Sequence, residues 1–147
     1  EDEANQLASK IIDLCQRGLF RPGDIAILAR EARLLPALRK ILERNDLFTS
    51  HFREGSFKVL ENEIKLITMH SAKGLEFPVV FVAGVNEGVI PNQYAGNDEE
   101  DIEQERKLMY VSMTRAAQRL YITATRDMRS PFLRDIDTEL IDERKFV

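Results

Sequence analysis

The sequence predicts an α/β domain with a mainly parallel sheet and helices on both faces. Two apolar runs, at residues 25–28 and 79–85, lack the alternation of a half-exposed strand and are typical of strands buried on both faces. Segments with apolar residues at helical spacing lie between the strand-like runs. Strands that alternate with helices favour right-handed crossovers, and therefore a parallel sheet.

The composition fits one globular domain with a hydrophobic core. The chain has 147 residues, of which 44% are apolar and 31% charged. Its net charge of -4 means that any nucleic-acid contact must come from a local patch rather than from bulk attraction. A single cysteine, Cys15, excludes an internal disulfide and favours a reducing compartment. We find neither an apolar run that could span a bilayer nor a secretory signal, so we expect a cytoplasmic protein.

The N-terminal half predicts two helices and two strands. Apolar residues recur at helical spacing from Ala4 to Cys15, and Gly18 can act as a C-cap. A turn at Arg21-Pro22-Gly23 separates this helix from the first strand. The expected elements of this half are helices over 3–17 and 34–45 and strands over 24–30 and 48–52, the last of them weak.

The C-terminal half predicts three further strands and a helix. Two strands are rich in Val, Ile and Phe. Asn97 or Asp98 can cap the helix, whose first turn is acidic. The tail from Asp127 is mixed and expected to be partly helical. The expected strands cover 63–69, 79–85 and 120–125, and the helix runs from its cap to about residue 116.

A polar loop follows the strand at 63–69, where we expect the carboxyl end of a buried strand and hence a ligand-binding position. Gly74 allows close backbone approach to a phosphate or sugar, and Lys73 offers a point charge. Glu76 suits ribose hydroxyls, since it would repel a phosphate. By spacing alone, an ordinary polar turn explains these residues equally well.

Residues 68–77 read Thr-Met-His-Ser-Ala-Lys-Gly-Leu-Glu-Phe and resemble motif V of the UvrD/Rep-type superfamily 1 DNA helicases. Residues 104–116, which end in Met-Thr-Arg-Ala, resemble motif VI. The resemblance implies a RecA-like three-layer domain, the C-terminal one called 2A. It implies DNA contacts for Thr68, His70, Ser71 and Lys73, ATP contacts for Gly74 and Glu76, and a γ-phosphate contact for a catalytic Arg115.

Two arginines that the resemblance assigns to ligands, Arg115 and Arg30, also have simpler explanations. Arg115 near a helix C-terminus could complement the helix dipole. Residues 24–30 resemble motif IVa, which implies a DNA phosphate contact for Arg30. Glu31 would repel that phosphate, and a surface salt bridge from Arg30 to an acid is an equally good interpretation. The acidic run 97–101 opens a helix rather than following a strand, so we interpret it as a solvated helix start and not as a metal site.

Several parts of a complete motor are missing from these residues. The sequence contains no G-x-x-x-x-G-K-[ST] phosphate loop, and we find no Walker B strand or Mg²⁺ ligand set. The resemblance therefore implies that ATP and Mg²⁺ are bound mainly by an upstream RecA-like domain of the same chain. Since the chain begins at Glu1 rather than Met, we expect a piece of a longer protein that is inactive alone. Only residues 53–60 stand where the family inserts its 2B domain, so we expect a single 2A domain over 1–147 without a full 2B insertion.

The resemblance therefore implies the C-terminal motor domain of an ATP-dependent DNA helicase that works on single-stranded DNA. The Gly-Leu-Glu-Phe form of motif V resembles the branch that moves 3′ to 5′. One alternative is a DNA-binding or partner-docking module without ATPase coupling. A metabolic enzyme with a nucleotide cofactor is disfavoured, because no Gly-rich fingerprint follows a first strand. The pathway, which could be DNA repair or another process, and the oligomeric state stay open.

Overall fold

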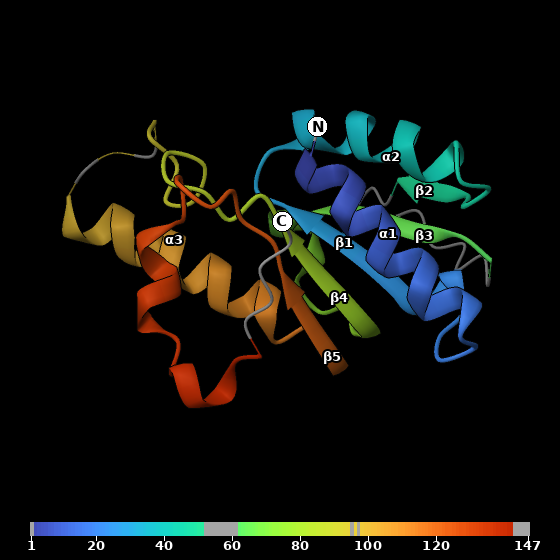
Figure 1. The fold of residues 1–147 in the computed structure, drawn as a ribbon. Coiled ribbons are helices and arrows are strands. Elements are labelled where there is room, and N and C mark those ends of the chain that lie inside the picture. The colour runs from blue at the N-terminus through green and yellow to red at the C-terminus, as the bar shows by residue number, and fades with distance from the viewer. Residues whose placement is uncertain (1, 52–61, 95, 97, 143–147) are drawn as a thin grey trace.

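The computed structural model describes residues 2–51, 62–94, 96 and 98–142, which form a parallel sheet with helices on both faces (Figure 1). All neighbouring strands run parallel, in the order β2-β3-β1-β4-β5. This arrangement confirms the predicted α/β class. The strands are β1 (Ile25–Ala29), β2 (Thr49–His51), β3 (Ile64–Thr68), β4 (Phe77–Ala83) and β5 (Ala116–Ile122).

Three helices complete the layers. The helices α1 (Asp2–Gln16) and α2 (Leu35–Glu43) cover one face of the sheet, and α3 (Glu99–Met113) covers the other (Figure 1). Alternate residues of β1 serve the two faces: Ile25 and Ile27 pack on the α1 and α2 side, and Ala26 and Leu28 on the α3 side. Burial on both faces explains the unbroken apolar runs of the sequence.

Each face has its own core. On the α1 and α2 side, Phe81 is only 1% exposed and stacks on Tyr121 with 4.7 Å between ring centroids. On the α3 side, Met109 and Phe132 pack against the opposite side chains of the same strands. The sheet therefore carries packed side chains on both sides, and polar side chains gather where the strands end.

The strand ends are aligned by the register. Ala29 of β1 pairs with Thr68 of β3 and with Ala83 of β4, so the three strands finish at the same level. We call this side of the sheet, where β1, β3 and β4 end, the carboxyl edge. The opposite side, where β4 and β5 begin, is the amino edge. Arg30 and the residues after Thr68 therefore leave the sheet at the same edge, as expected.

Some element bounds differ from the sequence-based expectation. β5 begins at Ala116 rather than at residue 120. The sequence pattern missed this start, because residues 117–119 are solvent-exposed and lack the large apolar side chains that mark a buried strand. Asp98 caps α3, accepting a hydrogen bond from the Asp101 N–H at 2.8 Å. The tail contains short 3₁₀ turns at Pro131–Asp135 and Thr138–Leu140 rather than an α-helix. Residue 52 and the 53–60 segment lie outside the described residues, as does Asn97.

None of the helices in the described ranges is both long and apolar enough to cross a bilayer.

The double-sided core predicts a large penalty for truncating Phe81. Phe81→Ala is expected to lower the free energy of unfolding by about 3–5 kcal/mol, since it removes a buried ring and leaves a cavity beside Tyr121. Phe48 is 66% exposed, so Phe48→Ala should change stability by less than about 0.5 kcal/mol. Urea unfolding followed by circular dichroism measures both, and equal effects would contradict this description of the core.

Candidate functional site

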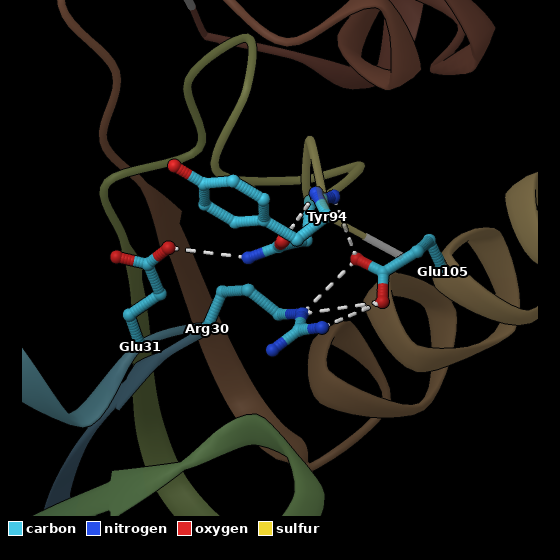
Figure 2. A network of polar contacts seen from close by, with 5 residues as sticks. Arg30, Glu31, Tyr94 and Glu105 are labelled. Atoms are coloured by element: carbon cyan, nitrogen blue, oxygen red, sulfur yellow. Dashed lines mark hydrogen bonds and ion pairs between the residues drawn. The ribbon is translucent and has the colours of Figure 1, made fainter. Parts of the chain in front are cut away.

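An ion pair joins the end of β1 to α3 at the carboxyl edge. The Arg30 guanidinium donates from Nη2 to Glu105 Oε1 at 2.8 Å and from Nε to Oε2 at 3.0 Å. This two-point geometry is the strong form of an arginine–carboxylate contact. The two side chains are 16% and 7% exposed, respectively, so the pair is largely removed from water. Figure 2 shows the two side chains facing each other.

The same carboxylate also holds the loop before α3. Glu105 Oε2 accepts a hydrogen bond from the Asn92 N–H at 3.0 Å. The Asn92 side chain donates from Nδ2 to Glu31 Oε1 at 3.1 Å and accepts from the Tyr94 N–H at 2.9 Å. Figure 2 shows this network, which connects the end of β1, the 92–94 loop and α3. The loop is therefore fixed relative to Arg30 by polar contacts on both sides.

Opposing effects act on the pKa of Glu105. Burial alone would raise the pKa of this carboxyl, because it disfavours the charged form. The hydrogen bonds from Arg30 and Asn92, with the charges of Arg30 and His70, outweigh burial and hold the pKa below its usual value. Glu105 is therefore an ionised carboxylate at neutral pH. His70 follows soon after Thr68, the last residue of β3, and therefore lies at the carboxyl edge.

The ion pair bears on both interpretations of Arg30. The partner is an acid, as the simpler one expected, but the pair is largely buried rather than on the surface. Arg30 Nη1 makes no hydrogen bond within the described residues, and Figure 2 shows the guanidinium with one nitrogen directed away from Glu105. Glu31 contacts Asn92 and Arg33, so its charge is balanced locally. A free donor on a fixed guanidinium remains able to contact an anion.

Glu105 is a site residue that the sequence patterns did not single out. It lies four residues before Met109, and therefore on the apolar stripe of α3 that packs on the sheet. An acidic residue at a core-facing helix position needs a buried partner, because an isolated buried carboxylate is costly. An acidic residue on the apolar stripe was therefore the one indication in the sequence that Glu105 has a buried partner. Identifying that partner requires knowing that Arg30 lies opposite.

The predicted DNA-binding residues after β3 begin at the same edge. The Thr68 hydroxyl donates to Ser71 Oγ at 3.0 Å, and both residues are half-buried. His70 and Lys73 are exposed. The structure therefore brings Arg30, Thr68, His70 and Ser71 to one edge of the sheet.

The rest of this loop leaves the carboxyl edge, which corrects the expectation that the whole loop stays there. Met69 and Ala72 are buried on the α3 side, in a 3₁₀ turn (Met69–Ala72) that starts the way back to the beginning of β4. β3 and β4 run parallel on either side of β1, so the chain must return along the sheet before it can pair. From Phe77 to Ala83, β4 spans about 20 Å at the usual rise of a strand. Gly74 and Glu76 therefore lie toward the amino edge.

Arg115 lies at the amino edge, between the end of α3 and the start of β5. Its guanidinium donates from Nε to the Val111 carbonyl at 3.0 Å, from Nη1 to the Leu75 carbonyl at 3.1 Å and from Nη2 to Thr114 Oγ1 at 3.2 Å. Its own carbonyl accepts from the Phe77 N–H at 2.9 Å. Arg115 and the 74–77 turn are thus joined directly. The contact with Val111 also satisfies a carbonyl of the last helical turn, as the simpler interpretation expected.

The residues of the amino edge fit a nucleotide by their chemistry. Gly74 has a φ of +80°, which favours glycine, and a side chain added there would meet no atom within 4 Å. The backbone beside Arg115 is therefore open to a ligand, and Glu76 is exposed and can accept hydroxyl hydrogen bonds. Three bonds use three of the five N–H donors of Arg115, which leaves two for phosphate oxygens. Within the described ranges, no cluster of three or more His, Cys, Asp or Glu side chains could hold a metal ion.

The predicted site residues therefore fall into two groups on one domain. The carboxyl edge holds Arg30, Thr68, His70 and Ser71, and the amino edge holds Gly74, Glu76 and Arg115. Lys73 lies on the segment between them. α3 also connects the edges: the ten residues from Glu105 to Arg115 correspond to about 15 Å along a helix axis.

Residues 35–127 match a protein family described as the UvrD-like helicase C-terminal domain. This range includes the 68–77 segment, Glu105 and Arg115, but not Arg30. It covers well over half of the chain.

Three bacterial proteins are similar to this chain in sequence. The chain is 45% identical over 94 residues to the ATP-dependent DNA helicase UvrD1 of Mycobacterium leprae, covering 57% of this chain and 12% of that protein. It is 46% identical over 87 residues to the ATP-dependent DNA helicase PcrA of Bacillus subtilis, covering 59% of this chain and 11% of that protein. It is 37% identical over 100 residues to DNA helicase II of Escherichia coli, covering 61% and 14%. The match thus spans about an eighth of the length of these relatives.

The fold has a counterpart among solved structures. The C-terminal domain of a possible DNA helicase from Lactobacillus plantarum WCFS1 superposes with a TM-score of 0.69, over 94% of this chain and 75% of that chain. Its sequence identity is 22%, so this likeness concerns the fold.

The lowered pKa of Glu105 predicts how stability depends on pH. Because the folded state lowers this pKa, ionised Glu105 stabilises the fold above its unfolded pKa of about 4.5, and the contribution disappears as the pH falls through the folded value. Glu105→Gln should lower the free energy of unfolding by about 1–3 kcal/mol at neutral pH, since it weakens a charged hydrogen-bond pair. The difference from the natural chain should shrink below about pH 4.5.

Urea unfolding between about pH 7 and about pH 3 measures this difference. Glu43→Gln is a matched control, because Glu43 forms an exposed ion pair with Arg39 and should contribute less than about 1 kcal/mol. A Glu105→Gln variant whose stability deficit is independent of pH would contradict the assignment of an ionised carboxylate.

Proposed function

Because this chain belongs to the UvrD-like helicase C-terminal domain family, we propose that it is the C-terminal motor half of an ATP-dependent DNA helicase. In this proposal the carboxyl edge binds single-stranded DNA. The amino edge faces an upstream RecA-like domain of the same protein, with ATP between them. Bound ATP, with Mg²⁺, supplies the phosphoanhydride whose hydrolysis drives movement along the strand. The direction that we propose is 3′ to 5′, and a bacterial cytosol is the setting that fits the relatives named above.

The crossover between β3 and β4 is the observation that carries this proposal. One segment, 68–76, begins among the polar groups of the carboxyl edge and ends beside Arg115. The two proposed ligands therefore contact opposite ends of the same short stretch of backbone. A displacement of one end is transmitted to the other without a long chain of intermediate contacts.

At the carboxyl edge, the proposed DNA contacts are made to phosphates. Arg30 presents Nη1, held in place by Glu105 through its other two nitrogens. His70 is exposed at this edge, and Lys73 is exposed on the segment that leaves it. Both can add hydrogen bonds or charge, with Thr68 and Ser71 placed beside His70. These residues form the local positive patch that a chain of net charge -4 requires.

At the amino edge, Arg115 is the residue that we propose to be catalytic. A guanidinium is always charged and can bind two phosphate oxygens at once, which suits charge that develops during phosphoryl transfer. The contact with the Leu75 carbonyl orients the guanidinium. Glu76 would accept hydrogen bonds from ribose hydroxyls, and Gly74 would admit the nucleotide close to the backbone.

Closure of the interdomain cleft around the nucleotide would couple the two edges. Since α3 and the 68–76 segment both run from one edge to the other, Arg115 and the DNA contacts would shift together as parts of one rigid domain. Release of the products would let the domain reset its grip. DNA repair is one process that such a motor could serve.

A second candidate is a DNA-binding or partner-docking module without ATPase coupling. The observation that favours it is the bonding of Arg115, since three hydrogen bonds within the domain would also satisfy a purely structural arginine. The two candidates differ in what removal of this guanidinium should do.

The first test replaces Arg115 by Ala in the full-length natural protein that contains these residues. We expect DNA-stimulated ATPase turnover to fall by about a thousandfold or more, because the guanidinium stabilises transition-state charge. Binding of single-stranded DNA without ATP should be retained, because Arg115 lies at the opposite edge from the DNA contacts. Arg44→Ala is the control, since Arg44 is exposed and lies outside both motifs. Unchanged turnover in Arg115→Ala would favour the second candidate.

The second test concerns Lys73 and the salt dependence of DNA binding. Lys73→Ala should weaken binding of single-stranded DNA, and the slope of log affinity against log salt should fall by about 0.7 for one lost phosphate contact. Fluorescence anisotropy at several salt concentrations measures the slope. Lys107→Ala removes another exposed lysine, on α3, and should leave the slope unchanged. Equal slopes for all three proteins would remove Lys73 from the proposed DNA site.

A further inference from the structure

The loop that the Glu105 carboxylate holds ends in an exposed aromatic ring. Tyr94 is 85% exposed, the largest exposed fraction among the large hydrophobic residues of the described ranges. Figure 2 shows its ring extending away from Glu105, toward the side on which Glu31 lies. A single exposed ring is by itself ordinary.

What distinguishes Tyr94 is how firmly its backbone is held. Its N–H donates to Asn92 Oδ1 at 2.9 Å, and the Asn92 N–H donates to Glu105 Oε2 at 3.0 Å. The same Oε2 atom accepts from Arg30 Nε at 3.0 Å. The backbone of Tyr94 is thus connected to the Arg30 guanidinium through a short series of hydrogen bonds, so part of the entropy of ordering this loop is lost before any ligand binds.

The charges around the ring favour one kind of ligand. Glu31 and Glu105 are each occupied by polar partners, and the free Nη1 of Arg30 is the unsatisfied donor of this network within the described residues. Proteins that bind single strands combine a cation for the backbone with an aromatic ring on which a base stacks. A duplex would hide its base faces, so the ring fits an unpaired nucleotide.

We propose that Tyr94 is a base-stacking platform for single-stranded DNA, next to the phosphate that Arg30 binds. This inference rests on the proposed function and assigns a further residue to its DNA site. Asn92 and Glu105 act as positioning residues, since they orient the ring and the guanidinium without touching the DNA. Stacking is tolerant of sequence, so the platform would grip any base.

The test measures binding of two oligonucleotides to the full-length natural protein, one of thymidines and one of abasic sites with the same phosphates. Tyr94→Ala should weaken binding of the thymidine strand by about 5- to 150-fold, which is the range of one base–aromatic stack. It should leave binding of the abasic strand and the salt slope unchanged, because no charge is lost. Tyr94→Phe keeps the ring and should restore binding of the thymidine strand.

Tyr110→Ala is the matched control, since Tyr110 is 67% exposed on α3 and should have no effect. Tyr94→Trp gives a spectroscopic readout, because it adds a Trp to residues that contain none. The fluorescence that it adds, relative to the natural protein, should be quenched by the thymidine strand but not by the abasic strand. If the natural protein and Tyr94→Ala bind the thymidine strand equally well, this inference alone is overturned. Natural protein that binds neither strand would overturn the proposed DNA site and the inference with it.

Discussion

The direction of three neighbouring strands is the constraint on which the rest depends. β3 and β4 flank β1 and run parallel to it, so the chain between them must travel back along the sheet. In most parallel sheets a helix makes this return, but here eight residues do so with a single 3₁₀ turn. Because the connection is so short, its polar residues lie at both edges. A segment that reads as one loop in the sequence therefore contributes residues to both edges of the sheet.

The Arg30–Glu105 pair shows how an acidic domain can keep a usable cation. A largely buried ion pair contributes little net stability, because desolvation of both charges offsets their attraction. Its effect is geometric instead: the carboxylate fixes two nitrogens of the guanidinium and a loop N–H at once. The guanidinium is then directed by the fold rather than by a flexible side chain. Specific orientation, and not bulk charge, is what this surface offers to a polyanion.

Features that depend on neighbouring residues could be predicted from the sequence, and features that depend on residues far apart in the sequence could not. Local patterns predicted the class of fold, the succession of helices and strands along the chain and a helix cap at Asn97 or Asp98, because apolar periodicity and capping act over a few residues. The onset of β5 at Ala116 was missed, since its first residues face solvent and are held by pairing with β4. The role of Glu105 could not be predicted, because its partner Arg30 lies 75 positions away. The division of the motif between two edges required the spatial order of the strands.

The span of α3 has a consequence for how this domain can vary. A helix turns by about 100° per residue, so inserting one residue between Glu105 and Arg115 would rotate one of them off its partner while the other stayed in place. The part of the loop that precedes Asn92 is not helical, so an inserted residue there would not rotate Glu105 relative to Arg115. Length changes among homologous domains should therefore collect outside this helical interval, whose register is set by contacts at both of its ends.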